Sequence, residues 1–128
     1  MALLEAMVRK TPKSTDMLGA ACWVRGTLNQ QLDTALAECD EALRIAPKGS
    51  WNLSTRCFVR YRTGEFALAI TDCDESLREY PKSAHALYVR GLAKHKTGDT
   101  PGGDADIAAA KAIDPKIAET YVDYGVTP

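Results

Sequence analysis

Three prolines recur along this chain at an interval that only a few folds can produce. Pro47, Pro81 and Pro115 are evenly spaced, and Gly64 and Gly98 keep the same interval. Each proline follows a stretch in which apolar residues recur every three or four positions, which is the period of one helix face. Glycine ends a helix at low cost, and proline prevents the next helix from continuing it. A period of about 34 residues with this pattern predicts an all-α chain of stacked helix–turn–helix units.

Aligning the prolines divides most of the chain into three units, residues 16–49, 50–83 and 84–117. We call the first helix of each unit the leading helix and the second the trailing helix. A repeat array exposes an apolar end face unless a terminal element covers it. We therefore expect residues 118–128 to form a capping helix with a tail, and residues 1–15 to form a leader or a partial cap.

The second unit shows the predicted pattern most clearly, with a leading helix over 51–63 and a trailing helix over 66–80. In the first unit Gln30 stands where the other units have glycine. In the third unit Thr100 precedes Pro101, which predicts a helix cap followed by proline at the first helical position.

The bulk composition is that of an ordinary globular chain. Hydrophobic residues make up 45% of the 128 residues, and the net charge is −1. A chain without a basic excess is not expected to bind nucleic acid through its phosphates. No run approaches the roughly 18 apolar residues of a membrane span, so we expect no membrane insertion. A cytoplasmic location is favoured, and a periplasmic one stays open if a signal segment was removed.

The four cysteines are predicted to be reduced thiols in the core. Cys39 and Cys73 are separated by the repeat interval and hold the same place in successive units. Equivalent places in stacked units lie about 8–10 Å apart, which exceeds the ~7 Å between Cα atoms that a disulfide can span. Cys22 and Cys57 also lack the paired C-x-x-C spacing of a zinc site. No bound metal is predicted.

The residues at fixed places in the units resemble the tetratricopeptide repeat. That family favours a large and a small residue in the leading helix, then alanine, a bulky residue, a small residue and proline. The second and third units carry, in this order, Leu53, Cys57, Ala69, Cys73, Ser76 and Pro81, and Leu87, Gly91, Gly103, Ile107, Ala110 and Pro115. The first unit departs at its first two places, which hold Gly19 and Trp23. The tail ADIAAAKAIDP is also similar to small bacterial tetratricopeptide proteins.

The resemblance implies a fold and a general role. The expected fold is an α-solenoid of three tetratricopeptide repeats with a C-terminal capping helix, in which the leading helices line a concave groove. The expected role is a non-enzymatic scaffold that binds another protein. Chaperone-binding members hold a C-terminal carboxylate with Lys, Asn, Asn, Lys and Arg. The matching positions here are Ala20, Val24, Thr55, His85 and Val89. None matches, so a clamp of that kind is not expected.

Charge is separated between the two kinds of helix. The leading helices of the second and third units carry Arg56, Arg60, Arg62, Arg90, Lys94 and Lys96, with no acidic residue among them. The trailing helices carry most of the acids. A basic inner face would attract an acidic segment. The alternative is internal pairing, because Arg56 and Asp72 lie across one hairpin at the same separation as Arg90 and Asp106. Arg62 and Lys96 are therefore the better groove candidates.

The places that line the groove in the family define the candidate peptide-binding residues. They are Trp51, Thr55, Phe58, Tyr61, Arg62, His85, Tyr88, Leu92, His95 and Lys96. Aromatic residues interleaved with cations suit a peptide that is both apolar and acidic. Two alternatives remain: Trp51 and Phe58 could pack between neighbouring units, or the same face could bury against a second copy and form a homodimer.

Motifs for catalysis are absent from the sequence. The stretch between His85 and His95 contains no acid, so neither a metal pair nor a catalytic triad is indicated. Gly102 and Gly103 are not followed by the G-K-[ST] of a phosphate-binding loop. We therefore predict no enzyme activity and no cofactor, and a protein or peptide as the partner.

Overall fold

The computed structural model describes residues 5–6, 9 and 14–128, so the predicted leader at 1–15 lies largely outside the described residues. The described part is all-α and contains no strand. Its labelled helices are α2 (Thr15–Leu28), α3 (Leu32–Ile45), α4 (Ser50–Thr63), α5 (Phe66–Glu79), α6 (Ala84–Lys96), α7 (Thr100–Ile113) and α8 (Ile117–Asp123). Within those residues, no helix combines the length and apolar character needed to cross a bilayer.

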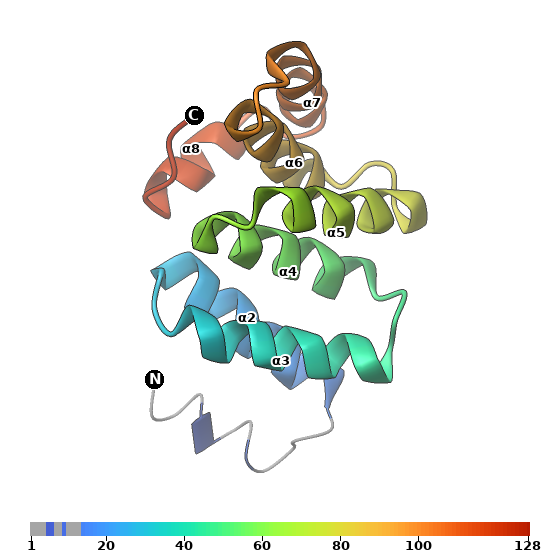
Figure 1. Ribbon diagram of the computed structural model, residues 1–128, viewed down its shortest axis with the longest axis vertical. Helices are drawn as coiled ribbons and strands as arrows, with labels where there is room; N and C mark the ends of the chain where they lie inside the picture. The colour runs from blue at the N-terminus through green and yellow to red at the C-terminus, as the bar shows by residue number, and fades with distance from the viewer. Residues whose placement is uncertain (1–4, 7–8, 10–13) are drawn as a thin grey trace.

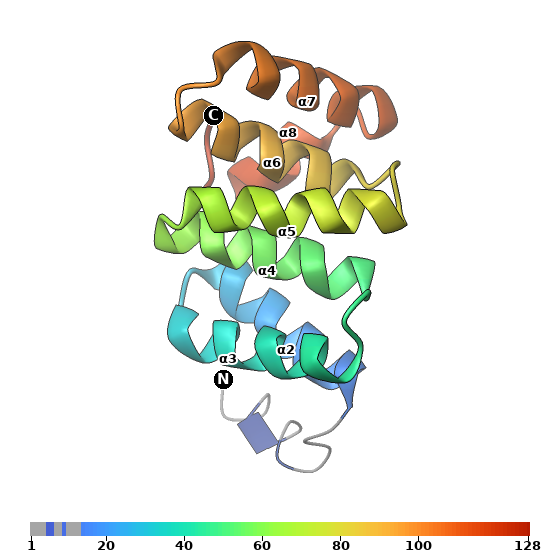
Figure 2. The same ribbon diagram turned by 45° about the vertical axis from the view of Figure 1, so that its right-hand side comes forward.

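The helices pack in chain order as three hairpins, α2–α3, α4–α5 and α6–α7, stacked along the long axis of the molecule (Figures 1 and 2). The leading helices α2, α4 and α6 contact one another directly. Successive trailing helices make no such contact among the described residues. A stack whose leading helices are close and whose trailing helices are apart must curve around the leading helices. The all-α prediction is confirmed, and the architecture is solenoid-like.

Local signals explain where these helices begin and end. Ser14 caps α2, and its hydroxyl accepts a hydrogen bond from the Met17 amide at 3.3 Å. Gly64 ends α4 with a φ of 85°, a left-handed conformation that favours glycine. At α7 the prediction was wrong by one residue: Asp99, and not Thr100, is the cap, and its carboxylate accepts from the Gly102 amide at 3.0 Å.

The first hairpin has one more turn residue than the second. The first residues of α2 and α4 are therefore one position further apart than those of α3 and α5. Asn29 and Gln31, on either side of Gln30, both take the left-handed conformation, with φ of 54° and 52°. Asn29 therefore ends the helix in place of glycine, because asparagine tolerates this region better than most residues. The Gln31 side chain is held by Arg25, whose Nε donates to its Oε1 at 3.0 Å.

This extra residue corrects the sequence alignment of the first unit. With the longer offset between α2 and α4, Leu18 corresponds to Leu53 and Cys22 to Cys57. Leu18 and Cys22 are both buried, as are their counterparts. The departure of the first leading helix from the repeat pattern was therefore a shift of one position, and α2 packs as α4 does.

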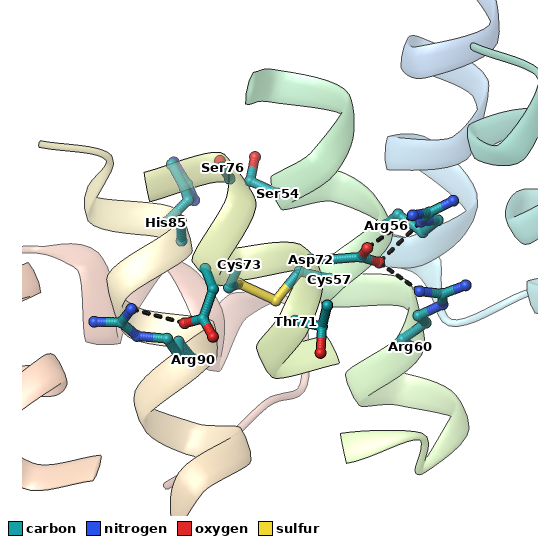
Figure 3. Close-up of a disulfide and its surroundings, with 12 residues drawn as sticks. Ser54, Arg56, Cys57, Arg60, Thr71, Asp72, Cys73, Ser76, His85 and Arg90 are labelled. Atoms are coloured by element: carbon teal, nitrogen blue, oxygen red, sulfur yellow. Dashed lines mark hydrogen bonds and ion pairs between the residues drawn. A yellow bond between two sulfur atoms is a disulfide. The ribbon is translucent and has the colours of Figure 1, made fainter. Parts of the chain in front are cut away.

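The cysteines form two disulfides, which contradicts the predicted reduced thiols. Cys22 in α2 is bonded to Cys39 in α3, and Cys57 in α4 to Cys73 in α5 (Figure 3). The sequence argument excluded pairing between hairpins but did not consider pairing within one. Partners on the two helices of a hairpin have Cα atoms 5.8 and 5.5 Å apart, inside disulfide range. Each bridge therefore ties a leading helix to its own trailing helix.

The third hairpin has no disulfide and is held by close packing and ion pairs. Gly91 in α6 takes the place of Cys57, and a Cβ there would lie 2.8 Å from the Gly103 carbonyl oxygen in α7. The two backbones thus approach more closely than a side chain would allow. No disulfide is needed to bring these helices together.

The last helix, α8, lies beside α6 and reaches back along the stack toward α4 (Figure 1). It was expected to cover the free end of the array. It contacts both helices of the last hairpin, α6 and α7. Several residues on the outer side of α7 stay exposed: Ala105, Ala108, Ala109, Ala112 and Ile113. The contacts that hold α8 belong to the candidate site.

Candidate binding surface

We define the leading-helix face as the side of α2, α4 and α6 that carries Trp23, Phe58, His85 and Tyr88. Ring contacts link Phe58, His85 and Tyr88 to Tyr121 of the C-terminal helix α8. Trp23 contacts Tyr124, which directly follows that helix. The predicted groove residues lie at different depths in and around this face. Four are buried, namely Thr55, Phe58, Tyr88 and Leu92. Four are partly buried, namely Tyr61, Arg62, His85 and His95. Trp51 and Lys96 are exposed.

Trp23 is the centre of the aromatic cluster on this face. Its ring centroid lies 5.1 Å from that of Trp51 and 5.7 Å from that of Phe58. His85 and Tyr124 meet it edge-on, each at 5.7 Å. The sequence analysis did not name Trp23 as a site residue. The longer offset of the first leading helix would have identified it, since it places Trp23 opposite Phe58.

Tyr121 of α8 fills the middle of the face. Its ring centroid lies 5.2 Å from that of Phe58 and 5.1 Å from that of Tyr88. Its hydroxyl is 2.9 Å from Nδ1 of His85. Complete burial raises the pKa of the Tyr121 hydroxyl well above its usual value. Burial also lowers the pKa of His85, with Asp114 acting in the opposite direction, so the imidazole is held in its neutral form.

Arg62 connects three elements at one end of the face. Its Nε donates to the Gly26 carbonyl at 3.2 Å, and its Nη2 donates to the carbonyls of Thr27 and Tyr124. Its guanidinium carbon also lies 5.1 Å from the centroid of the Phe58 ring. Burial lowers the pKa of Arg62, but an arginine remains charged at neutral pH. One cation thus holds the last turns of α2 and α8 together.

The other cations of the leading helices are mostly paired with trailing helices, and two predicted pairs are confirmed. Arg56 binds Asp72 through two hydrogen bonds of 2.8 and 2.9 Å (Figure 3). Arg90 binds Asp106 through two of 2.8 Å. Arg60 and Lys94 contact the same two carboxylates. These two carboxylates contact four of the six cations and offset half of their charge, so the inner face is less basic than the sequence suggested.

The same arginines also join neighbouring hairpins. Arg56 reaches Asp40 of α3 at 3.0 Å, and Arg90 reaches Asp74 of α5 at 2.9 Å. Burial opposes ionisation of Asp106, but hydrogen bonds from Arg90 and Lys94 outweigh it and lower the pKa of its carboxyl group. This ladder holds the stack together and leaves Arg62 and Lys96 for other contacts.

Arg62 and Lys96 line one recess of about 410 Å³ beside the end of α8. Its other walls include Tyr61 and Phe66, whose ring centroids are 5.6 Å apart. The described residues around it include no carboxylate side chain. Lys96 has no ion-pair partner among the described residues. The structure thus brings together the two cations that the sequence analysis preferred, and it places aromatic rings beside them.

A second recess, of about 400 Å³, lies around Trp51 and is lined mainly by apolar surface. Tyr80 and Ile113 contribute to it, and both are about as exposed as Trp51. His95 lies apart from both recesses and pairs with Asp104, Nε2 to Oδ1, at 2.8 Å. The described part of the chain holds no group of three or more His, Cys, Asp or Glu side chains that could bind a metal ion.

Comparison with known proteins does not assign this surface to a family. No family model matches the chain, and no curated protein is significantly similar to it.

Proposed function

We propose that this chain is a tetratricopeptide-type scaffold without enzyme activity, which binds an apolar and acidic segment of a partner protein. Three stacked hairpins and the equal offsets from α3 to α5 and from α5 to α7 support the family assignment. The partner segment would run along the leading-helix face and the recess at its end. Such scaffolds act by holding another molecule on a curved surface.

The recess beside α8 is the observation that carries the proposal. It combines the Lys96 ammonium group and the Arg62 guanidinium with the rings of Tyr61 and Phe66. Lys96 is exposed and free to meet a carboxylate, whereas Arg62 is already committed to backbone carbonyls. An acidic side chain of the partner would therefore contact Lys96, and a neighbouring apolar side chain would contact the two rings.

Selection from a displayed library of short random peptides tests this proposal. We expect peptides selected on the wild-type chain to be rich in acidic and aromatic residues and to bind less tightly as salt is added. The variant Lys96→Glu should bind them roughly tenfold more weakly, because it reverses the charge that meets the acid. The matched control is Lys111→Glu, which makes the same change at an exposed position on α7. Equal binding to both variants would exclude the recess as the site.

Self-association is a second candidate, favoured by the recess around Trp51. Three large apolar side chains, Trp51, Tyr80 and Ile113, are each roughly half exposed there, and clustered exposed apolar residues often mark interaction sites. Sedimentation equilibrium over a wide concentration range would detect a dimer. Replacing Trp51 with serine should then abolish it, and a chain that stays monomeric throughout would rule this candidate out.

A further inference from the structure

We propose that α8 is a resident ligand of the leading-helix face, and that the partner segment binds as a short helix that displaces it. This inference rests on the proposed function and deepens it by naming the form of the partner. It starts from the position of α8. That helix packs against α6 and α7. Its rings reach back along the stack, since Tyr121 contacts Phe58 of α4 and Tyr124 contacts Trp23 of α2.

Three inward-facing side chains of this segment follow the spacing of a helix bound in a groove, and Val126 beyond the helix is buried as well. Ile117, Tyr121 and Tyr124 are at positions i, i+4 and i+7. Ile117 and Tyr121 are fully buried, and Tyr124 is partly buried. Glu119, Val122 and Asp123 are exposed to solvent. Amphipathic helices dock in apolar grooves through this set of anchors, so α8 shows which segment the face accepts.

The face also supplies a contact for the carboxyl end of a docked helix. The Tyr124 carbonyl accepts a hydrogen bond from Arg62, which is held in place by the Gly26 carbonyl and the Phe58 ring. A cation at the end of a helix satisfies carbonyls that have no partner within it. Because this contact is made to the backbone, it would accept any sequence that ends a helix at that point.

The resident helix leaves one polar group of the face unsatisfied. The Tyr88 hydroxyl is buried beside Tyr121 and has no hydrogen-bond partner among the described residues. A buried hydroxyl without a partner lowers the stability of the arrangement that contains it. A segment that placed an acceptor next to Tyr88 would satisfy this group. This unsatisfied hydroxyl gives a partner helix that carries such an acceptor a basis for displacing α8.

Displacement of α8 would leave the rest of the fold in place. The helix has only seven residues, and a helix this short is not stable in water without its docking contacts. It is joined to α7 through Asp114, Pro115 and Lys116 and carries none of the disulfides. Both disulfides and the ion-pair ladder lie among α2 to α7. They would hold the stack together while α8 leaves it.

The test uses the full-length chain and, as the probe, a fluorescently labelled synthetic peptide of residues 115–128. The wild-type chain should bind this peptide weakly, because its own α8 occupies the site. The variant Tyr124→Ala weakens the resident helix and should bind the peptide about tenfold more tightly, since apparent affinity rises with the fraction of open protein. The matched control Val122→Ala changes an exposed residue of the same helix and should behave like the wild type. A scrambled peptide that lacks the i, i+4, i+7 spacing should not bind.

Native-state hydrogen exchange of the wild-type chain provides a second measurement, in case the Tyr124 variant does not fold. We expect the amides of residues 121–126 to exchange at least a hundredfold faster than those of α4, through local opening. Equal protection of α8 and α4 would overturn the proposal. So would a folded Tyr124→Ala variant that binds the peptide no more tightly than the wild type.

The two proposals can fail separately. If library peptides bind through Lys96 but α8 never opens, displacement is wrong and the partner site stands. If the labelled segment binds as expected but no library peptide depends on Lys96, the acidic partner is wrong and the resident helix stands.

Discussion

Asp72 illustrates at the scale of a single residue how this chain uses charge. Its carboxylate is almost fully buried, yet it accepts hydrogen bonds from two arginines of the preceding helix, Arg56 and Arg60. Burying a carboxylate is costly unless it is paired and hydrogen-bonded. Asp106 in the next hairpin has the same arrangement with Arg90 and Lys94. Most cations of the leading helices therefore pair with aspartates of the trailing helices and stabilise the fold.

Replacing Asp72 with asparagine should lower the free energy of unfolding by about 3 kcal/mol, because Arg60 loses its counter-charge and Arg56 keeps only the exposed Asp40. Asp40→Asn is the matched control: it removes a carboxylate from the same Arg56, but the side chain of Asp40 is 58% exposed. The control should cost less than about 1 kcal/mol. Urea denaturation of the three chains measures both values. Equal losses would mean that burial does not determine the strength of these pairs.

At the scale of the helices, the sequence predicts the helix bounds that recur at the repeat interval. It misses the features that depart from this interval. The bounds of α4 and α5 agree with the expected 51–63 and 66–80 to within one residue. The one-residue shift of the first leading helix was missed because a fixed period cannot detect one inserted residue. The position of α8 was missed because its contacts are with Trp23 and Phe58, far back in the chain. Spacing within one segment carries no information about such long-range contacts.

The sequence also predicted part of the candidate site, namely which residues lie near one another, but not which of them are buried. The sequence placed Arg62 and Lys96 together, and the structure shows them lining one recess. It also named Tyr88, which is buried against Tyr121. A pattern that places a residue on the inner side of a helix cannot say whether another part of the chain covers it. The same limit applies to Phe58.

Protonation of His85 should loosen the contact between α6 and α8. Burial lowers the pKa of His85 in the folded chain, so the unfolded chain takes up this proton at a higher pH. The contribution of neutral His85 to the free energy of unfolding is therefore fully present above the ordinary histidine pKa of about 6.5. It decreases as the pH drops below that value.

The variant His85→Gln cannot take up this proton, and its amide can still bond to the Tyr121 hydroxyl. Urea denaturation at about pH 7.5 and about pH 5.5, on either side of the ordinary histidine pKa, should therefore show a smaller loss for the variant than for the wild type. The two chains share every other titrating group, so the difference reports His85 alone. Identical pH dependence would contradict the burial argument.

At the scale of the whole molecule, the disulfides are confined to the first two hairpins of the stack. The first two hairpins are each closed by a disulfide, whereas the third relies on contact between the backbones at Gly91 and Gly103. Disulfides are typical of proteins that fold in an oxidising compartment. In such a compartment the first two hairpins would be closed covalently and the third would not.

Reduction should destabilise the first two hairpins. Each bridge joins residues 17 or 16 positions apart, which corresponds to about 3 kcal/mol of stability for a loop of that size. The double variant Cys57→Ala, Cys73→Ala should lose about this amount, and a reducing agent should lower its stability further by opening the remaining bridge. A chain without any of the four cysteines is the control and should not respond to the reducing agent. A melting temperature of the wild type that is unchanged on reduction would show that the bridges do not stabilise the fold.

The uneven placement of the bridges also determines what a protease could release. Gln30 and Gln31 are exposed in the first turn, and the bridge between Cys22 and Cys39 encloses them. A cut there would leave one covalent molecule, and the two fragments would separate only after reduction. A cut at Gly98, in the turn of the third hairpin, would leave α7 and α8 attached by non-covalent contacts alone. A denaturant alone would therefore release the C-terminal fragment of a chain cut in the third hairpin, whereas a chain cut in the first would also need a reducing agent.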